Sequence, residues 1–176
     1  MSIAQIGGSS AFAFALIENN ARHTALGGVS IANTDHDPAA GFQNPALINH
    51  QMHNNVSLSY ANHVADINYG FGSYGKKIDS IHAMTFNIGF YDYGNFIRTN
   101  NAGDIIGEFD ATDYTFQVGL SRKITDKITV GANGKFLYSV YEAYVSTAGG
   151  IDLGGQYADN DQLMNVGFLI KNIGYQ

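Results

Sequence analysis

The sequence predicts an all-β protein built from antiparallel strands, and three observations lead to that class. Apolar and polar residues alternate over long segments, which is the pattern of strands with one apolar and one polar face. Charged residues make up 14% of the 176 residues, against about 25% in soluble domains. Glycine (21 residues) and aromatic residues (12%) are frequent and proline is rare (2 residues), a composition typical of membrane barrel walls.

The clearest alternation lies in residues 109–141. A short polar link, residues 123–127, joins two runs and makes them antiparallel neighbours. Each run has about 14 residues, against a usual ~5–6, and a tilted strand of that length crosses a hydrocarbon layer roughly 25 Å thick. We therefore predict a transmembrane hairpin whose even-numbered apolar residues face lipid, with Gly134 opposite Tyr114 or Phe116. The apolar positions are Tyr114, Phe116, Val118 and Leu120, then Ile128, Val130, Ala132, Phe136, Tyr138 and Val140.

Residues 1–54 differ from the rest and are predicted to form a small helical or irregular plug, in or against the mouth of the barrel. They hold both prolines and no long alternating run. Residues 11–20 fit a capped helix, although their pattern also fits a strand. Residues 34–38 are expected to turn, and residues 44–48 to start a helical turn with Pro45 in its first position.

Residues 55–176 are predicted to form the first half of a transmembrane β-barrel, with about seven strands. Outside the central hairpin, the alternating runs cover residues 56–60, 67–72, 84–90, 151–154 and 164–171. Short polar links at residues 76–80, 123–127 and 158–162 fall on one rim, and the longest link, residues 94–107, falls on the other. Short turns on one side and longer loops on the other are typical of outer-membrane barrels.

The chain carries no motif that indicates catalysis or a metal site. It has no cysteine and a formal net charge of −6, which argue against thiol chemistry, disulfides and nucleic-acid binding. Its six histidines lack the spacing of metal ligands, and no nucleophile motif of hydrolases is present. We therefore expect a protein that is not an enzyme and that holds no cofactor or metal.

Four charged residues fall on the polar parity of the predicted strands, namely Asp113, Lys135, Asp152 and Lys171. They are expected to face the lumen, where the two lysines would pair with the two acids. The expected register places Lys135 opposite Asp113 or Thr115. Charged side chains on this face would support the wall or tune a pore.

An ordered series of short segments resembles one family of outer-membrane proteins. The first segments are residues 21–28, 35–37 and 42–47, with Arg22, Gly27, Gly28, Asp35, Asp37, Asn44 and Pro45. Later segments are residues 93–96, 107–109, 135–139, 141–154 and 171–176. The first group resembles the plug, and the whole series resembles the PorQ/PorV family of type IX secretion system outer-membrane proteins, which are FadL-like barrels. The PorQ branch is the more similar.

The resemblance implies a multi-pass protein of the outer membrane of Bacteroidetes, in contact with its lipid, with no catalytic activity of its own. It would anchor the cell-surface attachment complex for secreted cargo, with a PorZ-like surface protein and the PorU/PorV complex as partners. Because FadL-like barrels have roughly fourteen strands, the chain is expected to be a fragment that holds the plug and the N-terminal half of the barrel. Two alternatives stay open: a FadL-type channel for hydrophobic compounds, which needs an apolar tunnel, and a soluble β-domain or adhesin.

Overall fold

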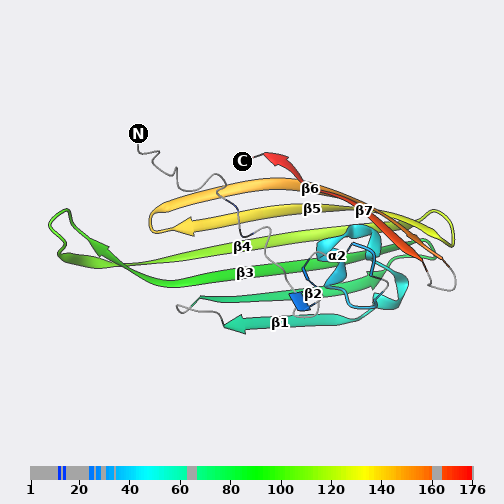
Figure 1. Ribbon diagram of the computed structural model, residues 1–176, viewed down its shortest axis with the longest axis horizontal. Helices are drawn as coiled ribbons and strands as arrows, with labels where there is room; N and C mark the ends of the chain where they lie inside the picture. Colours follow the sequence, from blue (N-terminus) through cyan, green and yellow to red (C-terminus); the bar gives the residue numbers. More distant parts are fainter. Residues whose placement is uncertain are drawn as a thin grey trace.

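The computed structural model describes residues 12, 14, 24, 25, 27, 28, 31–33, 35–62, 67–159 and 164–175. Seven strands form one antiparallel sheet in chain order (Figure 1), which confirms the predicted all-β class and strand number. The strands are β1 (Val56–Asn62), β2 (Asn68–Lys77), β3 (His82–Thr99), β4 (Ile105–Lys123), β5 (Ile128–Tyr141), β6 (Tyr144–Ala158) and β7 (Asn165–Tyr175). Strands β1 and β7 are the two edges of this sheet.

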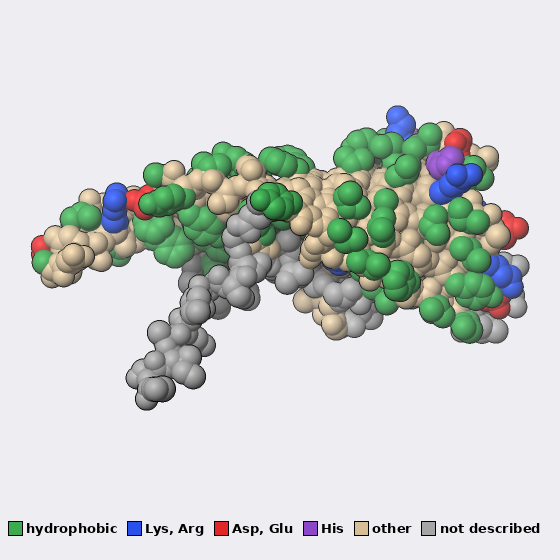
Figure 2. All heavy atoms as spheres, turned by 90° about the horizontal axis from the view of Figure 1, so that it is seen from above, with side chains coloured by type: hydrophobic (Ala, Val, Ile, Leu, Met, Phe, Trp, Pro, Cys, Tyr) green, Lys and Arg blue, Asp and Glu red, His purple; other side chains and the backbone are tan. Residues whose placement is uncertain are grey.

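The two faces of the sheet differ as the alternation predicts. On β4 and β5 most of the even-numbered apolar side chains are exposed and none is buried, whereas the odd-numbered polar side chains in the middle of both strands are buried. No second layer of described residues covers the exposed side, which we call the outer face; the other side is the inner face. Figure 2 shows hydrophobic side chains spread over the middle of the molecule and charged side chains gathered at its two ends.

The register of the central hairpin differs from the prediction, although its parity is as expected. Gly134 lies opposite Val118 rather than Tyr114 or Phe116, and Lys135 lies opposite Gln117 rather than Asp113 or Thr115. A slip of two residues keeps every side chain on its own face, so the alternation alone does not exclude it. The register therefore depends on how the turn and the inner face pack.

Tyr69 and Phe71 of β2 face inward instead of outward. Phe71 is buried, and its ring centroid lies 5.7 Å from that of Phe42, which precedes the first strand. Gly70 and Gly72 consequently occupy the outer face of β2, between the outward side chains of β1 and β3. An aromatic cluster thus forms under the inner face, where the sequence had suggested mainly polar groups.

Strands β3 and β4 extend beyond their neighbours as a two-stranded hairpin (Figure 1). Strand β2 pairs with β3 only as far as Asp92, and β5 pairs with β4 only from Ala111 onward. The link predicted over residues 94–107 is therefore mostly strand, and the turn is confined to residues 100–104. This prediction was wrong because the chain continues to pair with itself after the rest of the sheet has ended.

The two ends of the strands form two rims. At the first, the links at residues 78–81, at residues 124–127 and after Ala158 join successive strands; we call it the short-turn rim. The opposite, hairpin rim carries the turn at residues 100–104 and the tight turn between β5 and β6. The name follows the predicted short links, but the described turns of the two rims are of similar length. The rims differ instead in how far their strands project.

Three short helical segments of the plug lie over the inner face near the short-turn rim (Figure 1). They are α2 (Ala40–Gln43), η2 (Pro45–Leu47) and η3 (His50–Met52). Element η2 confirms the predicted helical turn, whereas α2 and η3 were not predicted. Most of residues 11–20, for which a helix was expected, lie outside the described residues. No described helix is long and apolar enough to cross a membrane.

Candidate functional site

The predicted plug motif forms the contact between the plug and the wall. Asn44 caps η2, because its Oδ1 accepts a hydrogen bond from the backbone N–H of Ala46 at 3.0 Å. Its Nδ2 donates to the carbonyl oxygen of Ile31 at 2.8 Å, which ties two parts of the plug together. Pro45 occupies the first position of the turn, as predicted, and η2 lies against β4, β5 and β6.

The other residues of the plug motif shape turns. The carboxylate of Asp35 accepts a hydrogen bond from the N–H of His36, and that of Asp37 accepts one from the N–H of Ala39. Gly27 and Gly28 have φ values of 96° and 100°, a conformation that favours glycine. Arg22 lies outside the described residues. The acids of the motif therefore stabilise local backbone.

Two glycines on the inner face let the plug approach the wall. A Cβ atom at Gly131 would overlap the backbone of Pro45, and one at Gly154 would overlap the side chain of Asn44. Gly131 and Gly154 therefore provide space for the plug. The sequence carried a usable signal, since both glycines lie on the inward parity of adjacent strands and pair directly.

Two buried amides on the wall complete this contact. Asn133 donates from Nδ2 to the carbonyl oxygen of Gly41 at 3.0 Å. Gln117 donates from Nε2 to the carbonyl oxygens of Gly41 and Phe42, each at 3.3 Å. Carbonyl groups at the end of a short helix need such donors when water is excluded. These residues were not predicted, although inward parity and a polar side chain distinguish both.

One of the predicted lumen ion pairs is present. The Nζ of Lys135 lies 2.7 Å from Oδ2 of Asp152, and both side chains are almost completely buried. Lys135 also donates to Oδ1 of Asn172 at 2.8 Å, and the N–H of Asn172 donates to Oδ1 of Asp152 at 2.7 Å. The network joins β5, β6 and β7, and each charge keeps a partner, as a buried ion pair requires.

Asp113 binds hydroxyl groups instead of a lysine. Its Oδ1 accepts a hydrogen bond from Ser139 at 2.5 Å, and its Oδ2 accepts from Tyr93 at 2.7 Å and from Tyr141 at 3.2 Å. The predicted pairing of Asp113 with a lysine is wrong, because the actual register brings Ser139 opposite it. The three donors connect β3, β4 and β5 under the inner face.

Lys171 reaches from the wall to the plug. Its Nζ lies 3.3 Å from Oε1 of Gln43, the last residue of α2. The four predicted charges therefore do not form one site. Two of them make an ion pair, one accepts hydroxyl groups and one contacts the plug, so their arrangement joins strands and plug into one unit.

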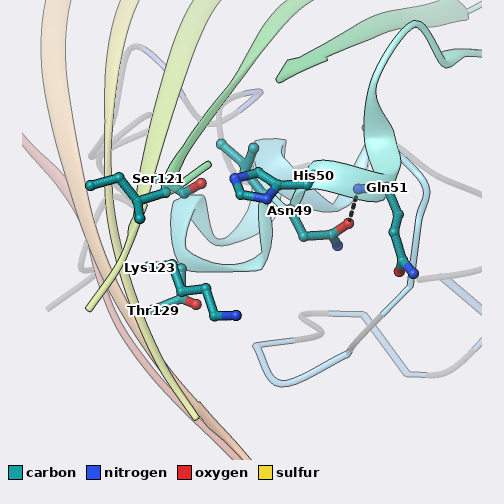
Figure 3. A pocket seen from close by; sticks show the side chains of 8 residues that line it. Asn49, His50, Gln51, Ser121, Lys123 and Thr129 are labelled. Carbon is teal, nitrogen blue, oxygen red and sulfur yellow. Dashed lines mark hydrogen bonds between the residues drawn. The ribbon is translucent and has the colours of Figure 1, made fainter. Parts of the chain in front are cut away.

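A cavity of about 250 Å³ lies at the short-turn rim between η3 and the wall (Figure 3). Six of the residues that line it are labelled in Figure 3: Asn49, His50, Gln51, Ser121, Lys123 and Thr129. Burial lowers the pKa of His50, and the charges of Lys77 and Lys123 lower that pKa further. The hydroxyl of Ser121 donates to the carbonyl of Ala83 at 3.3 Å. The cavity thus places Lys123 near His50, and its serine donates to a backbone carbonyl instead of to a base.

Within the described part of the chain, no three His, Asp or Glu side chains lie close enough together to hold a metal ion. Comparison of the sequence with protein-family models and with curated proteins found no match. Two features of the sheet are the candidates for function: an apolar outer face that no described residue covers, and an inner face that is hydrogen-bonded to the plug.

Proposed function

We propose that this chain forms the plug and part of the wall of an outer-membrane β-barrel, and that the barrel is a non-enzymatic component of a type IX secretion system. In that role it anchors the complex that attaches secreted cargo to the cell surface. The membrane location is supported by the outer face, and the secretion role is supported by the family resemblance.

The outer face carries the proposal. Its side chains are large and apolar, and they are exposed from one edge of the sheet to the other, as at Leu58 (80%), Phe116 (47%) and Phe168 (63%). Water-soluble monomers rarely expose continuous apolar patches larger than about 300–600 Å². The 14 residues of β5 span roughly 45 Å along the strand, or about 34 Å at a tilt near 40°. That length exceeds the apolar band of a barrel wall, which is about 25 Å tall.

The inner face supports a structural role. Its polar groups bind one another and the plug, and its aromatic cluster packs against Phe12, Phe14 and Phe42. A wall that is joined to its plug by buried hydrogen bonds suits a rigid support for partner proteins. The segments that resemble the PorQ branch supply the identity of those partners in the proposal: a PorZ-like surface protein and PorU with PorV.

The alternative of a FadL-type channel receives less support. Such a channel needs an apolar passage for its substrate. The apolar part of the inner face is instead packed against the plug, with Phe71 against Phe42 and Phe14 against Tyr91 at ring-centroid distances of 5.7 Å and 5.5 Å.

One experiment tests the membrane location, and a second tests the secretion role. Membranes from expressing cells, washed with alkaline carbonate, should retain the protein in the outer-membrane fraction; release by the wash would refute the membrane location. Deletion of the gene should leave cargo proteins secreted but unattached, and affinity purification in mild detergent should recover a PorZ-like protein. Normal cargo attachment in the deletion strain would refute the secretion role.

A further inference from the structure

The short-turn rim holds cations that no described acid neutralises. Lys123 pairs with Asp126, Lys127 with Asp159, and His82 with Asp79. The remaining cations of this rim are Lys76, Lys77 and Arg122, and none of the three forms an ion pair with a described residue. At the hairpin rim, in contrast, Arg98 pairs with Glu142 at 2.8 Å.

Two of these unpaired cations lie on the outer face. Lys76 and Arg122 have the even parity of the lipid-facing residues, and both side chains are exposed. Lys76 pairs in register with Met84, and Arg122 pairs with His82, so the two cations flank β3 from either side. Two strand spacings and two residues along β3 separate them, which is roughly 12 Å and within reach of two long side chains for one anionic group. Lys77, the next residue, has the inward parity.

An apolar trough on the outer face leads to this pair. Gly72 forms its floor on β2, because it has no side chain between the outward residues of β1 and β3. At Gly70 the ring of Phe90 lies over the strand and closes that end of the trough. Its walls include Leu58, Tyr60, Ile88 and Phe90, and two adjoining hollows of about 450 Å³ and 410 Å³ share Leu58, Gly72 and Ile88.

The trough runs along β2 toward the rim. Gly70, Gly72, Tyr74 and Lys76 share one face of the strand, and Tyr74 lines the hollow between Gly72 and Lys76. The path from Gly70 to Lys76 is about 20 Å, or roughly 15 Å across the membrane at a tilt near 40°. Half of a hydrocarbon core of about 30 Å is the depth of one leaflet. The trough and the cations therefore have the spacing of an acyl chain and its headgroup.

We propose that the outer face of β1–β4 is a binding site for an anionic phospholipid, with an acyl chain in the trough and the phosphate between Lys76 and Arg122. The site deepens the proposed function, because it requires that the outer face lies in a membrane. Charge complementarity selects the ligand: an acyl chain alone would not need the cations, and a free phosphate would not need the trough. A zwitterionic lipid would leave the two positive charges only partly compensated.

The test uses the full protein in nanodiscs that contain phosphatidylcholine and phosphatidylglycerol, with lipid enrichment measured by native mass spectrometry. One Lys or Arg near an anionic leaflet contributes an attraction equivalent to about fivefold in binding. Lys76→Gln should therefore lower phosphatidylglycerol enrichment up to about fivefold, and Arg122→Gln by a similar factor. Lys77→Gln removes the same charge from the adjacent residue on the inner face, and it should leave the enrichment unchanged.

A second pair of variants tests the trough without changing charge. Gly72→Leu should displace the acyl chain and lower the enrichment, because a Cβ atom there already lies 3.3 Å from Leu58 and would extend into the hollow. Gly134→Leu, on the outer face of β5 with no atom within 4 Å of its Cβ, should have no effect. Equal losses for Lys76→Gln and Lys77→Gln would overturn the site in favour of general rim charge.

The proposal and the underlying function fail in different ways. If the wild-type protein enters nanodiscs but shows no preference for phosphatidylglycerol, the lipid site is wrong and the membrane location stands. If the protein does not enter nanodiscs of either lipid, the membrane location itself is wrong.

Discussion

The outer and inner faces of the same strands obey opposite rules. On β4, Val118 is apolar and 47% exposed, whereas its neighbour Gln117 is polar and 2% exposed. In a water-soluble domain the apolar residue would be the buried one. In the proposed membrane location, apolar side chains that are exposed in the isolated chain would be buried in lipid. The inner face, although polar, is where packing is specific.

The largest effect should come from breaking the inner-face ion pair. Asp152→Ala leaves the charge of Lys135 buried without its acid, and removing one partner of a buried pair destabilises by about 3–5 kcal/mol. Urea unfolding of the full protein in lipid vesicles measures this. Asp104→Ala, at the exposed hairpin turn, removes one exposed hydrogen bond from Asn100; it is the control and should change stability by no more than about 1 kcal/mol. If Asp152→Ala and Asp104→Ala changed stability equally, water would have to reach the inner face.

The next effect tests the outer face. Val118→Arg places a charge on the middle of the proposed lipid-facing band and should destabilise the protein in vesicles by about 2–4 kcal/mol. Ile124→Arg, in the turn at the short-turn rim and 53% exposed, should cost only ~0–1 kcal/mol. If Val118→Arg were as mild as Ile124→Arg, water and not lipid would cover the outer face.

A smaller effect separates the faces at two glycines of one strand. Gly131→Ala should destabilise the protein by about 1–3 kcal/mol, because the added methyl group overlaps the backbone of Pro45. Gly134→Ala adds the same group to the outer face, where no atom lies within 4 Å. Protease resistance of the plug should fall only in Gly131→Ala; a loss in both variants would show that the strand, and not the plug contact, is sensitive.

The smallest effect concerns pH at the short-turn rim. The hydrogen bond with His82 lowers the pKa of Asp79 from its ordinary value of 3.8 to about 2. Because the folded-state pKa is the lower one, this stabilisation is present above about pH 4 and is lost as the pH falls toward about 2. Asp79→Asn should therefore be less stable than the wild type at pH 5, and the difference should shrink by pH 2. A difference that does not change with pH would contradict this assignment.

The sequence predicted the faces more successfully than the contacts between them. Alternation was sufficient for the parity of β4 and β5 and for the inward position of Lys135 and Asp152, because side-chain direction in a strand repeats strictly. It did not give the partner of Asp113, because a register change of two residues preserves all faces while replacing every neighbour. The extension of β3 and β4 was also missed, since Gly94 and Gly107 resemble loop residues.

By itself, the sequence determined an antiparallel sheet with an apolar and a polar face, together with a plug turn at Asn44 and Pro45. These properties depend on residues that are close in the chain, through alternation and helix capping. Only the tertiary structure decided which way Phe71 points, why Gly131 and Gly154 lack side chains and which donors Asp113 has. Each of those outcomes depends on residues that are far apart in sequence and meet only when the plug packs against the inner face of the sheet or neighbouring strands pair.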